Sequence, residues 1–306
     1  MREERTALVA AVTGSALWGL SGTAAQVVLQ RYDFPVFGLV AIRMLGAAVL
    51  LMAVARPRWP RPWTASFAAL AILGLVGSQV TYLEALFYTN VTTATLLQFL
   101  FLPMVVAYEV AAGAITFSAR WAALLALAGA GTILLIGVVS PRGFGILVTP
   151  LGLLFGLLSA VSGAYYTIAT RRFVQTESPL WVTTWGFFLG GLVTLPFGAY
   201  TLWQYHWPGS VPGLALLGGL ILFVVIAGTL LAFSLFIYGL RRLTATEAGV
   251  AASFEPIVAS AAGLLLLGVA LTSYQYLGGG LIVVAVGWLG GTVHSRVDAS
   301  KRVVPP

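Results

Sequence analysis

Long apolar stretches separated by short polar connections fill almost the whole chain. A helix that crosses the hydrocarbon core of a bilayer needs about 20 mostly apolar residues. Stretches of this length predict ten membrane-spanning helices, and their short connections make neighbouring helices antiparallel. The predicted spans are residues 6–29, 34–55, 66–88, 91–112, 119–138, 149–170, 179–200, 212–236, 246–267 and 271–293.

Composition excludes a water-exposed surface over most of the molecule. Charged residues make up 8% of the chain, whereas a soluble domain carries about 25%. Lipid must therefore be the solvent for most of the surface, and we expect an all-α integral membrane protein. The first apolar stretch follows Arg2 and Arg5, as in a signal peptide. It is longer than the 7–15 apolar residues of such peptides, so we interpret it as the first spanning helix.

Basic residues lie mainly on one side of the predicted membrane. With a cytoplasmic N-terminus, 13 of the 16 Lys and Arg residues face the cytoplasm. Arg31 and Arg142 lie outside, and Arg43 lies within a helix. By the positive-inside rule, this bias predicts a multi-pass protein of the cytoplasmic (inner) membrane with both termini cytoplasmic. The net charge of +7 is thereby explained without a nucleic-acid partner.

The two halves of the sequence resemble each other. Residues 15–23 (SALWGLSGT) align with 159–167 (SAVSGAYYT) at an offset of 144. The connection 56–62 has three Arg, whereas its counterpart 201–211 has none. Each copy holds five helices, and since five is odd, the second copy enters the membrane upside down. We predict two inverted five-helix repeats, 1–143 and 144–306, an organisation typical of secondary transporters with a mid-membrane substrate site. Further matching pairs are Pro35 with Pro179, Gly46 with Gly190, and Pro103 with Pro256 at an offset of 153.

Two segments resemble the EamA-type transporters of the drug/metabolite transporter superfamily. Residues 85–98 (ALFYTNVTTATLLQ) and 243–259 (LTATEAGVAASFEPIVA) are similar to the corresponding helix junctions in the family's two halves. Residues 278–282 (GGGLI) and Trp18-Gly19 fit the family's last and first helices. The resemblance covers the whole chain, although the family's proline in the fourth helix is displaced by one residue. It implies a secondary carrier, often an exporter of amino acids, metabolites or drugs.

Charged residues inside predicted spans are candidates for function, because a charge at the bilayer centre costs about 2.5–3.5 kcal/mol on insertion scales. Arg43 can bind a substrate carboxylate through its planar fork, or form a structural pair. Glu84 can pair with Arg43 or contact a cationic solute. Glu255 precedes Pro256 and can take up and release the proton that drives transport, or form a packing hydrogen bond.

Polar and aromatic side chains recur at helical spacing and form a second group of candidates. They predict a solute-binding interior that attracts an amphipathic solute or a cation through ring faces. The alternative is helix packing together with aromatic belts at the membrane surface. Pro103 and Pro256 are candidate hinges that permit rocking, or else static kinks. With Arg43 and Glu84, the candidate substrate-binding residues are Trp18, Gln79, Tyr82, Gln98, Tyr166 and Trp185.

These patterns favour a secondary transporter of a small polar or amphipathic metabolite, such as an amino acid or drug-like solute, moved by alternating access and exported. A zwitterionic amino acid would satisfy both the acidic groups and Arg43. The alternatives are a channel-like or facilitative pore and a carrier of organic cations. We expect no enzyme, cofactor or metal: the chain has no Cys, two separated His residues and no G-x-x-x-x-G-K-[ST] loop. The expected partners are the solute, the lipid bilayer and protons as coupling ion.

Overall fold

Helices occupy all ten predicted ranges in a computed structural model, which describes residues 2–58, 63–113, 116–136, 139–140, 143–144, 147–173, 176–240, 251–285 and 288. The start of the span 246–267 and the end of the span 271–293 lie outside the described residues. The first half contains α1 (Arg2–Gln26), η1 (Val27–Arg31), α2 (Val36–Ala55), α3 (Ala65–Ala69), η2 (Leu70–Val76), α4 (Gly77–Tyr88), α5 (Val91–Gln98), α6 (Phe101–Ala111) and α7 (Ala119–Leu135).

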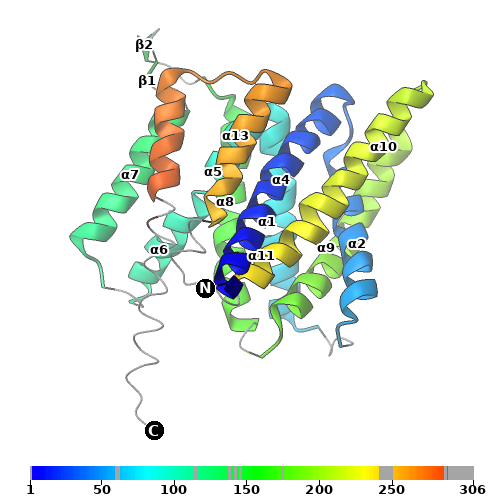
Figure 1. The fold of residues 1–306 in the computed structure, drawn as a ribbon, viewed down its shortest axis with the longest axis horizontal. Coiled ribbons are helices and arrows are strands. Elements are labelled where there is room, and N and C mark those ends of the chain that lie inside the picture. The colour runs from blue at the N-terminus through cyan, green and yellow to red at the C-terminus, as the bar shows by residue number, and fades with distance from the viewer. Residues whose placement is uncertain are drawn as a thin grey trace.

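The second half follows a short hairpin, β1 (Val139–Ser140) with β2 (Gly143–Phe144). Residues 273–285 are also helical. Figure 1 shows that α1, α11 and α13 run side by side, with α7 at one edge of the bundle and α10 at the other. The remaining helices are α8 (Pro150–Phe173), α9 (Pro179–Gln204), α10 (Val211–Val225), η3 (Ile226–Leu231), α11 (Ala232–Leu240) and α13 (Phe254–Leu267).

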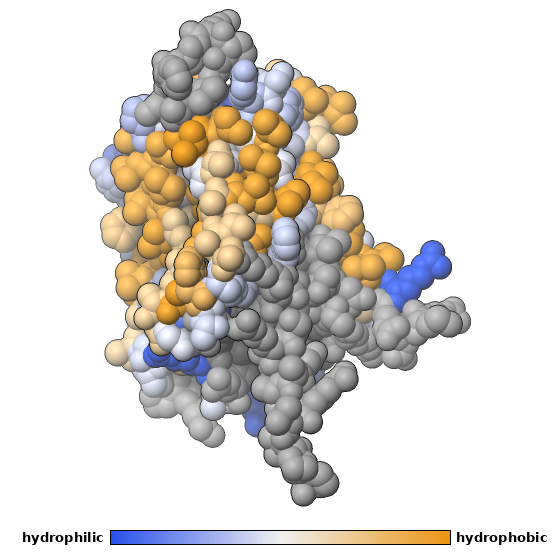
Figure 2. All heavy atoms as spheres, turned by 90° about the vertical axis from the view of Figure 1, so that its left-hand side faces the viewer, coloured by the Kyte–Doolittle hydropathy of each residue, from blue (hydrophilic) through white to orange (hydrophobic). Residues whose placement is uncertain are grey.

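The surface of the bundle is suited to lipid. Among the described residues, seven helical segments are long and apolar enough to cross a membrane, and Trp121–Leu135 and Phe254–Leu267 are shorter apolar helices. Large apolar side chains such as Leu265 and Leu266 are exposed. Figure 2 shows an apolar band over one face of the bundle, with hydrophilic residues gathered toward its ends. This is a multi-pass membrane protein, while the count of ten crossings stays a prediction.

Glycines bring the helices of the two halves into close contact. A Cβ on Gly46 would lie 3.0 Å from Val225 Cγ1, and a Cβ on the matching Gly190 would lie 2.9 Å from Val76 Cγ2. Small residues at such positions let helix backbones approach closely where lipid provides no hydrophobic driving force. Val225 directly precedes η3 and Val76 is the last residue of η2, so each of the two matching glycines packs beside a π-turn of the opposite half.

Both predicted proline kinks coincide with interruptions of a helix. The turn at Phe99 and Leu100 separates α5 from α6, and Ser253 forms a turn just before α13. Pro103 has no N–H to offer the carbonyl of Phe99, which instead accepts from Leu102 N at 3.2 Å. The breaks are 153 residues apart, as are the two prolines.

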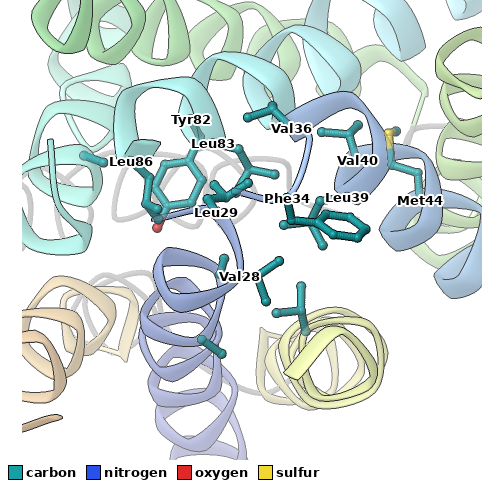
Figure 3. Close-up of a cluster of buried hydrophobic side chains, with 14 of the residues drawn as sticks. Val28, Leu29, Phe34, Val36, Leu39, Val40, Met44, Tyr82, Leu83 and Leu86 are labelled. Atoms are coloured by element: carbon teal, nitrogen blue, oxygen red, sulfur yellow. The ribbon is translucent and has the colours of Figure 1, made fainter. Parts of the chain in front are cut away.

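The best-packed part of the core lies where α1 and η1 meet α2 and α4. Val28, Leu29, Leu39 and Met44 are completely buried there. Figure 3 shows these side chains beside Leu83, Leu86 and the ring of Tyr82. This apolar packing fixes the positions of α2 and α4, which carry two of the polar residues described below.

A substitution at Gly198 tests the packing of α9 on α2. A Cβ on Gly198 would lie 2.7 Å from Ala41 Cβ and 3.0 Å from the Phe37 carbonyl oxygen, so a leucine there would push the helices apart. We expect Gly198→Leu to destabilise the protein by about 1–3 kcal/mol, measured as a lower melting temperature in detergent. Gly218→Leu is the control, because nothing lies within 4 Å of its Cβ position. Equal melting temperatures for the two variants would contradict this packing.

Candidate functional site

Four polar side chains meet in the interior, and each comes from a different helical segment. Arg43 lies on α2, Tyr82 on α4, Thr229 on η3 and Glu255 on α13. Arg43 Nε donates a hydrogen bond to Thr229 Oγ1 at 2.9 Å. Arg43 also interacts electrostatically with both Tyr82 and Glu255. The opposite charges of Arg43 and Glu255, contributed by different halves of the chain, therefore lie near each other.

The guanidinium and the carboxylate both retain unused hydrogen-bonding capacity. An arginine side chain has five N–H donors, but within the described part of the chain only Nε of Arg43 has a partner. Glu255 makes no side-chain hydrogen bond to a described residue. Neither residue is among the described residues that have a fully buried side-chain N or O atom without a hydrogen-bond partner. The described part of the chain therefore does not satisfy all the hydrogen-bonding capacity of either group.

Tyr82 connects this cluster to α1 and α5. Its hydroxyl group forms a hydrogen bond of 3.1 Å with Thr95 Oγ1, and in Figure 3 the ring lies among apolar side chains. A Cβ on Gly22 would lie 2.6 Å from the Tyr82 hydroxyl oxygen. Gly22 therefore allows α1 to pass directly over the tyrosine.

Aromatic rings line the neighbouring region. The ring centroids of Trp18 on α1 and Phe233 on α11 are 4.9 Å apart, as are those of Trp18 and Phe236. Phe187 on α9 packs edge-on against Phe233 at 5.4 Å. Phe233 comes four residues, about one helical turn, after Thr229. An aromatic wall of Trp18, Phe187, Phe233 and Phe236 thus lies about one turn from the hydroxyl that holds Arg43.

Two of the three buried polar side-chain atoms that lack a hydrogen-bond partner among the described residues lie close to this region in the sequence. They are Ser15 Oγ on α1 and Gln79 Oε1 on α4. Each lies three residues before a member of the aromatic and polar region, Trp18 and Tyr82 respectively. A buried polar atom without a hydrogen bond costs about 1–3 kcal/mol, which a bound water or solute would recover.

The predicted site residues divide into two groups. The structure brings Arg43, Tyr82 and Glu255 together and places the Trp18 ring wall nearby. Glu84 is partly buried, and the electrostatic partner of Arg43 is Glu255 instead.

Trp185 lies in another part of the bundle, whereas Tyr166 packs both there and against the core cluster that contains Tyr82. Both belong to a cluster around Phe67, and Trp185 Nε1 donates to the Arg58 carbonyl at 3.1 Å. Gln98 is the last residue of α5, next to the helix break, and its side chain is partly exposed. The placement of these three residues gives no direct support to a role in the same site as Arg43.

Sequence reasoning missed a glutamine network at the end of the bundle predicted to be extracellular. Gln26 Nε2 donates to Gln30 Oε1 at 2.9 Å, while Gln26 Oε1 accepts from Val91 N at 2.8 Å. Gln30 Nε2 donates to the carbonyls of Leu86, Phe87 and Thr89 at 2.9–3.1 Å. These bonds tie the end of α1 to the junction of α4 and α5. The signal in the sequence was two amides four residues apart at the end of an apolar stretch.

The repeat supplies the backbone of the site but not its charges. At the offsets of 144 and 153, Phe187 is the counterpart of Arg43, and Leu102 is the counterpart of Glu255. Each charged position is therefore apolar in the opposite half. Among the described residues, no group of three or more His, Cys, Asp or Glu could hold a metal ion.

The two-repeat helical bundle and its interior polar cluster define a membrane transporter. A family model described as "EamA-like transporter family" matches residues 5–137 and 150–290, one match in each half. The chain belongs to this family, which is part of the drug/metabolite transporter superfamily. The resemblance inferred from residues 85–98 and 243–259 is thereby confirmed.

Individual relatives agree with this assignment. The chain is 28% identical to the "Uncharacterized inner membrane transporter YicL" of Salmonella typhimurium, covering 94% of this chain and 95% of the relative. It is 30% identical to the "Threonine/homoserine exporter RhtA" of Escherichia coli over 45% of this chain and 44% of RhtA. A solved crystal structure shares the fold with a TM-score of 0.61 at 21% identity, covering 96% of this chain and 99% of that one. The protein is a multi-pass inner-membrane transporter.

Gln30 tests the contribution of the glutamine network. Gln30→Met keeps the approximate size of the side chain but leaves three backbone carbonyls without their donor. We expect a loss of about 1–3 kcal/mol of stability, measured as a lower melting temperature in detergent. Gln204→Met is the control, because Gln204 is exposed at the end of α9. If Gln30→Met has the same melting temperature as the wild type, the network does not hold α1 to the α4–α5 junction.

Proposed function

We propose that the protein is a secondary transporter that exports a small zwitterionic metabolite of the amino-acid type by alternating access. The observation that carries this proposal is the pair of opposite charges, Arg43 and Glu255, which lie near each other and whose hydrogen-bonding capacity the described residues do not fill. A zwitterion presents a carboxylate and an ammonium group a short distance apart. It can therefore satisfy both side chains at once.

The physical reason is the cost of unsatisfied charge in a bilayer. A planar guanidinium binds a carboxylate through two parallel hydrogen bonds, and the carboxylate of Glu255 accepts hydrogen bonds from an ammonium group. The solute loses its water shell when it binds. Opposite charges of the protein then take the place of water around its carboxylate and its ammonium group. The aromatic wall around Trp18 offers an apolar surface for the rest of an amphipathic solute.

Competition at Glu255 provides a route to proton coupling. One carboxylate can hold either a proton or the ammonium group of the solute. If the solute leaves on the outside and a proton takes its place, return of the protonated carrier to the inside exchanges proton entry for solute export. The breaks before Pro103 and Pro256 supply matching points where α5–α6 and α13 can bend during this exchange.

The topology belongs to the same proposal. We place both termini in the cytoplasm, as the distribution of Lys and Arg indicates. We place the boundary between the repeats near residue 143, in accordance with the two family matches that end at 137 and begin at 150.

An organic-cation carrier is the second candidate. The aromatic wall and Glu255 favour it, but Arg43 opposes it, because a cation would meet a like charge within the site. Saturable counterflow in liposomes separates both carriers from a channel-like pore. The similarity to RhtA, whose printed name gives threonine and homoserine as exported solutes, supports the zwitterionic class.

A thermal-shift panel tests the class of solute. Purified protein is heated with amino acids, organic cations, organic anions and neutral metabolites. We expect zwitterionic amino acids to raise the melting temperature, because a ligand that binds only the folded state stabilises it by about 2.7 kcal/mol at 100 times its Kd. Strong stabilisation by another class, with no effect of amino acids, would show that the amino-acid assignment is wrong.

Glu255→Gln tests proton coupling. The amide keeps the size of the side chain but cannot exchange a proton, so we expect pH-driven transport in liposomes to be abolished. Binding should be retained, although weakened, because Arg43 still holds the carboxylate of the solute. Glu84→Gln is the matched control and should retain pH-driven flux. Undiminished proton-driven flux in Glu255→Gln would remove Glu255 from the coupling role.

A further inference from the structure

Thr229 holds Arg43 in a way that no sequence motif indicates. Its side chain is 1% exposed, and its Oγ1 both accepts from Arg43 Nε at 2.9 Å and donates to the Val224 carbonyl at 3.0 Å. A hydroxyl group has one proton to donate. Because that proton is used on Val224, the oxygen presents lone pairs to the guanidinium.

The π-turn η3 creates this arrangement. Thr229 comes five residues after Val224, the spacing at which residues of a π-turn face each other. A Cβ at the neighbouring Gly228 would overlap the Ser21 hydroxyl, so α1 packs directly on the turn. Single π-turns inside α-helices occur frequently at functional sites. Here the turn directs a hydroxyl group of the second half toward an arginine of the first half.

The anchoring of Arg43 has a consequence for its charged neighbour. Arg43 and Glu255 attract each other, and a direct, bidentate ion pair would use the hydrogen-bonding capacity of both groups. Such a pair would leave nothing for a solute to satisfy. The bond to Thr229 fixes Nε, the nitrogen nearest the chain, and leaves the terminal nitrogens without a hydrogen bond to any described residue.

We propose that Thr229 is a positioning residue that determines affinity: it holds Arg43 so that the terminal guanidinium nitrogens bind the carboxylate of the solute instead of pairing with Glu255. This inference depends on the proposed zwitterion site. It adds a residue on the π-turn of the second half, outside every segment that resembles the family motifs.

The test is threonine counterflow in proteoliposomes with Thr229→Val. We expect KM to rise about tenfold or more, as for loss of a hydrogen bond to a charged group, with a maximal rate within about twofold of the wild type. Thr229→Ser keeps the hydroxyl group and should restore the wild-type KM. Thr194→Val is the matched control, because Thr194 is equally buried but bonds only to backbone carbonyls of its own helix.

Melting temperature without solute separates positioning from a purely structural role. If Thr229→Val lets Arg43 pair with Glu255, the unliganded variant should melt at or above the wild-type temperature. A lower melting temperature with an unchanged KM would overturn the inference, as would a Thr229→Ser variant as defective as Thr229→Val. Thr229→Ala also removes the hydroxyl group and replaces the valine variant if that variant does not fold.

A double variant distinguishes this inference from the proposed function. Arg43→Lys has no Nε–H, the donor that bonds to Thr229 Oγ1, so adding Thr229→Val should change neither KM nor melting temperature further. If the KM of the double variant rises by the product of the two single effects, the anchoring role is overturned. The same holds if the two single shifts in melting temperature add in the double variant. If the unliganded proteins show this coupling but threonine is not bound, the zwitterionic solute class is wrong while the anchoring of Arg43 stands.

Discussion

The placement of two opposite charges inside an apolar bundle is the constraint on which the rest of the structure depends. A charged side chain in a bilayer is retained only where it faces the interior and has a partner. Arg43 and Glu255 meet this condition through their mutual attraction, and Thr229 supplies a further bond to Arg43. Among the described residues these interactions leave donors and acceptors of both groups unused, and the proposed role of the pair in binding a charged solute depends on this.

The helices are irregular where they surround this cluster. The π-turn η3 carries Thr229, and the break before α13 lies two residues from Glu255. Irregular backbone at membrane depth is tolerated where protein or a water-filled cavity satisfies it. The first half has corresponding irregularities, η2 and the break at Phe99 and Leu100, while the repeat counterparts of Arg43 and Glu255, which are Phe187 and Leu102, are apolar. The two halves therefore share a backbone design, but the charges occur once.

Much of the fold could be predicted from the sequence because one physical rule dominates it. Apolar length identified the ten helical ranges, and the pairing of Pro103 with Pro256 at an offset of 153 indicated both proline breaks. The sequence also indicated Arg43, Tyr82 and Glu255, because charged or polar groups in apolar stretches are costly and therefore conspicuous.

The partners of these residues could not be predicted, because they depend on how the helices rotate about their axes. The sequence suggested Glu84 as the partner of Arg43, whereas the packing of α13 brings Glu255 near it. Thr229 looked like an ordinary residue of an apolar helix, since the π-turn that exposes its hydroxyl to Arg43 has no signature in composition. Trp185 shared the aromatic character of Trp18, yet it packs around Phe67 instead.

The most direct test of the account is the charge requirement of the solute. Counterflow of labelled threonine is measured in proteoliposomes against threonine, its methyl ester, which lacks the carboxylate, and its deaminated analogue, which lacks the ammonium group. Recognition by both Arg43 and Glu255 predicts that only the intact zwitterion exchanges efficiently. If the methyl ester exchanges as well as threonine does, Arg43 does not bind the solute and the paired-charge account is contradicted.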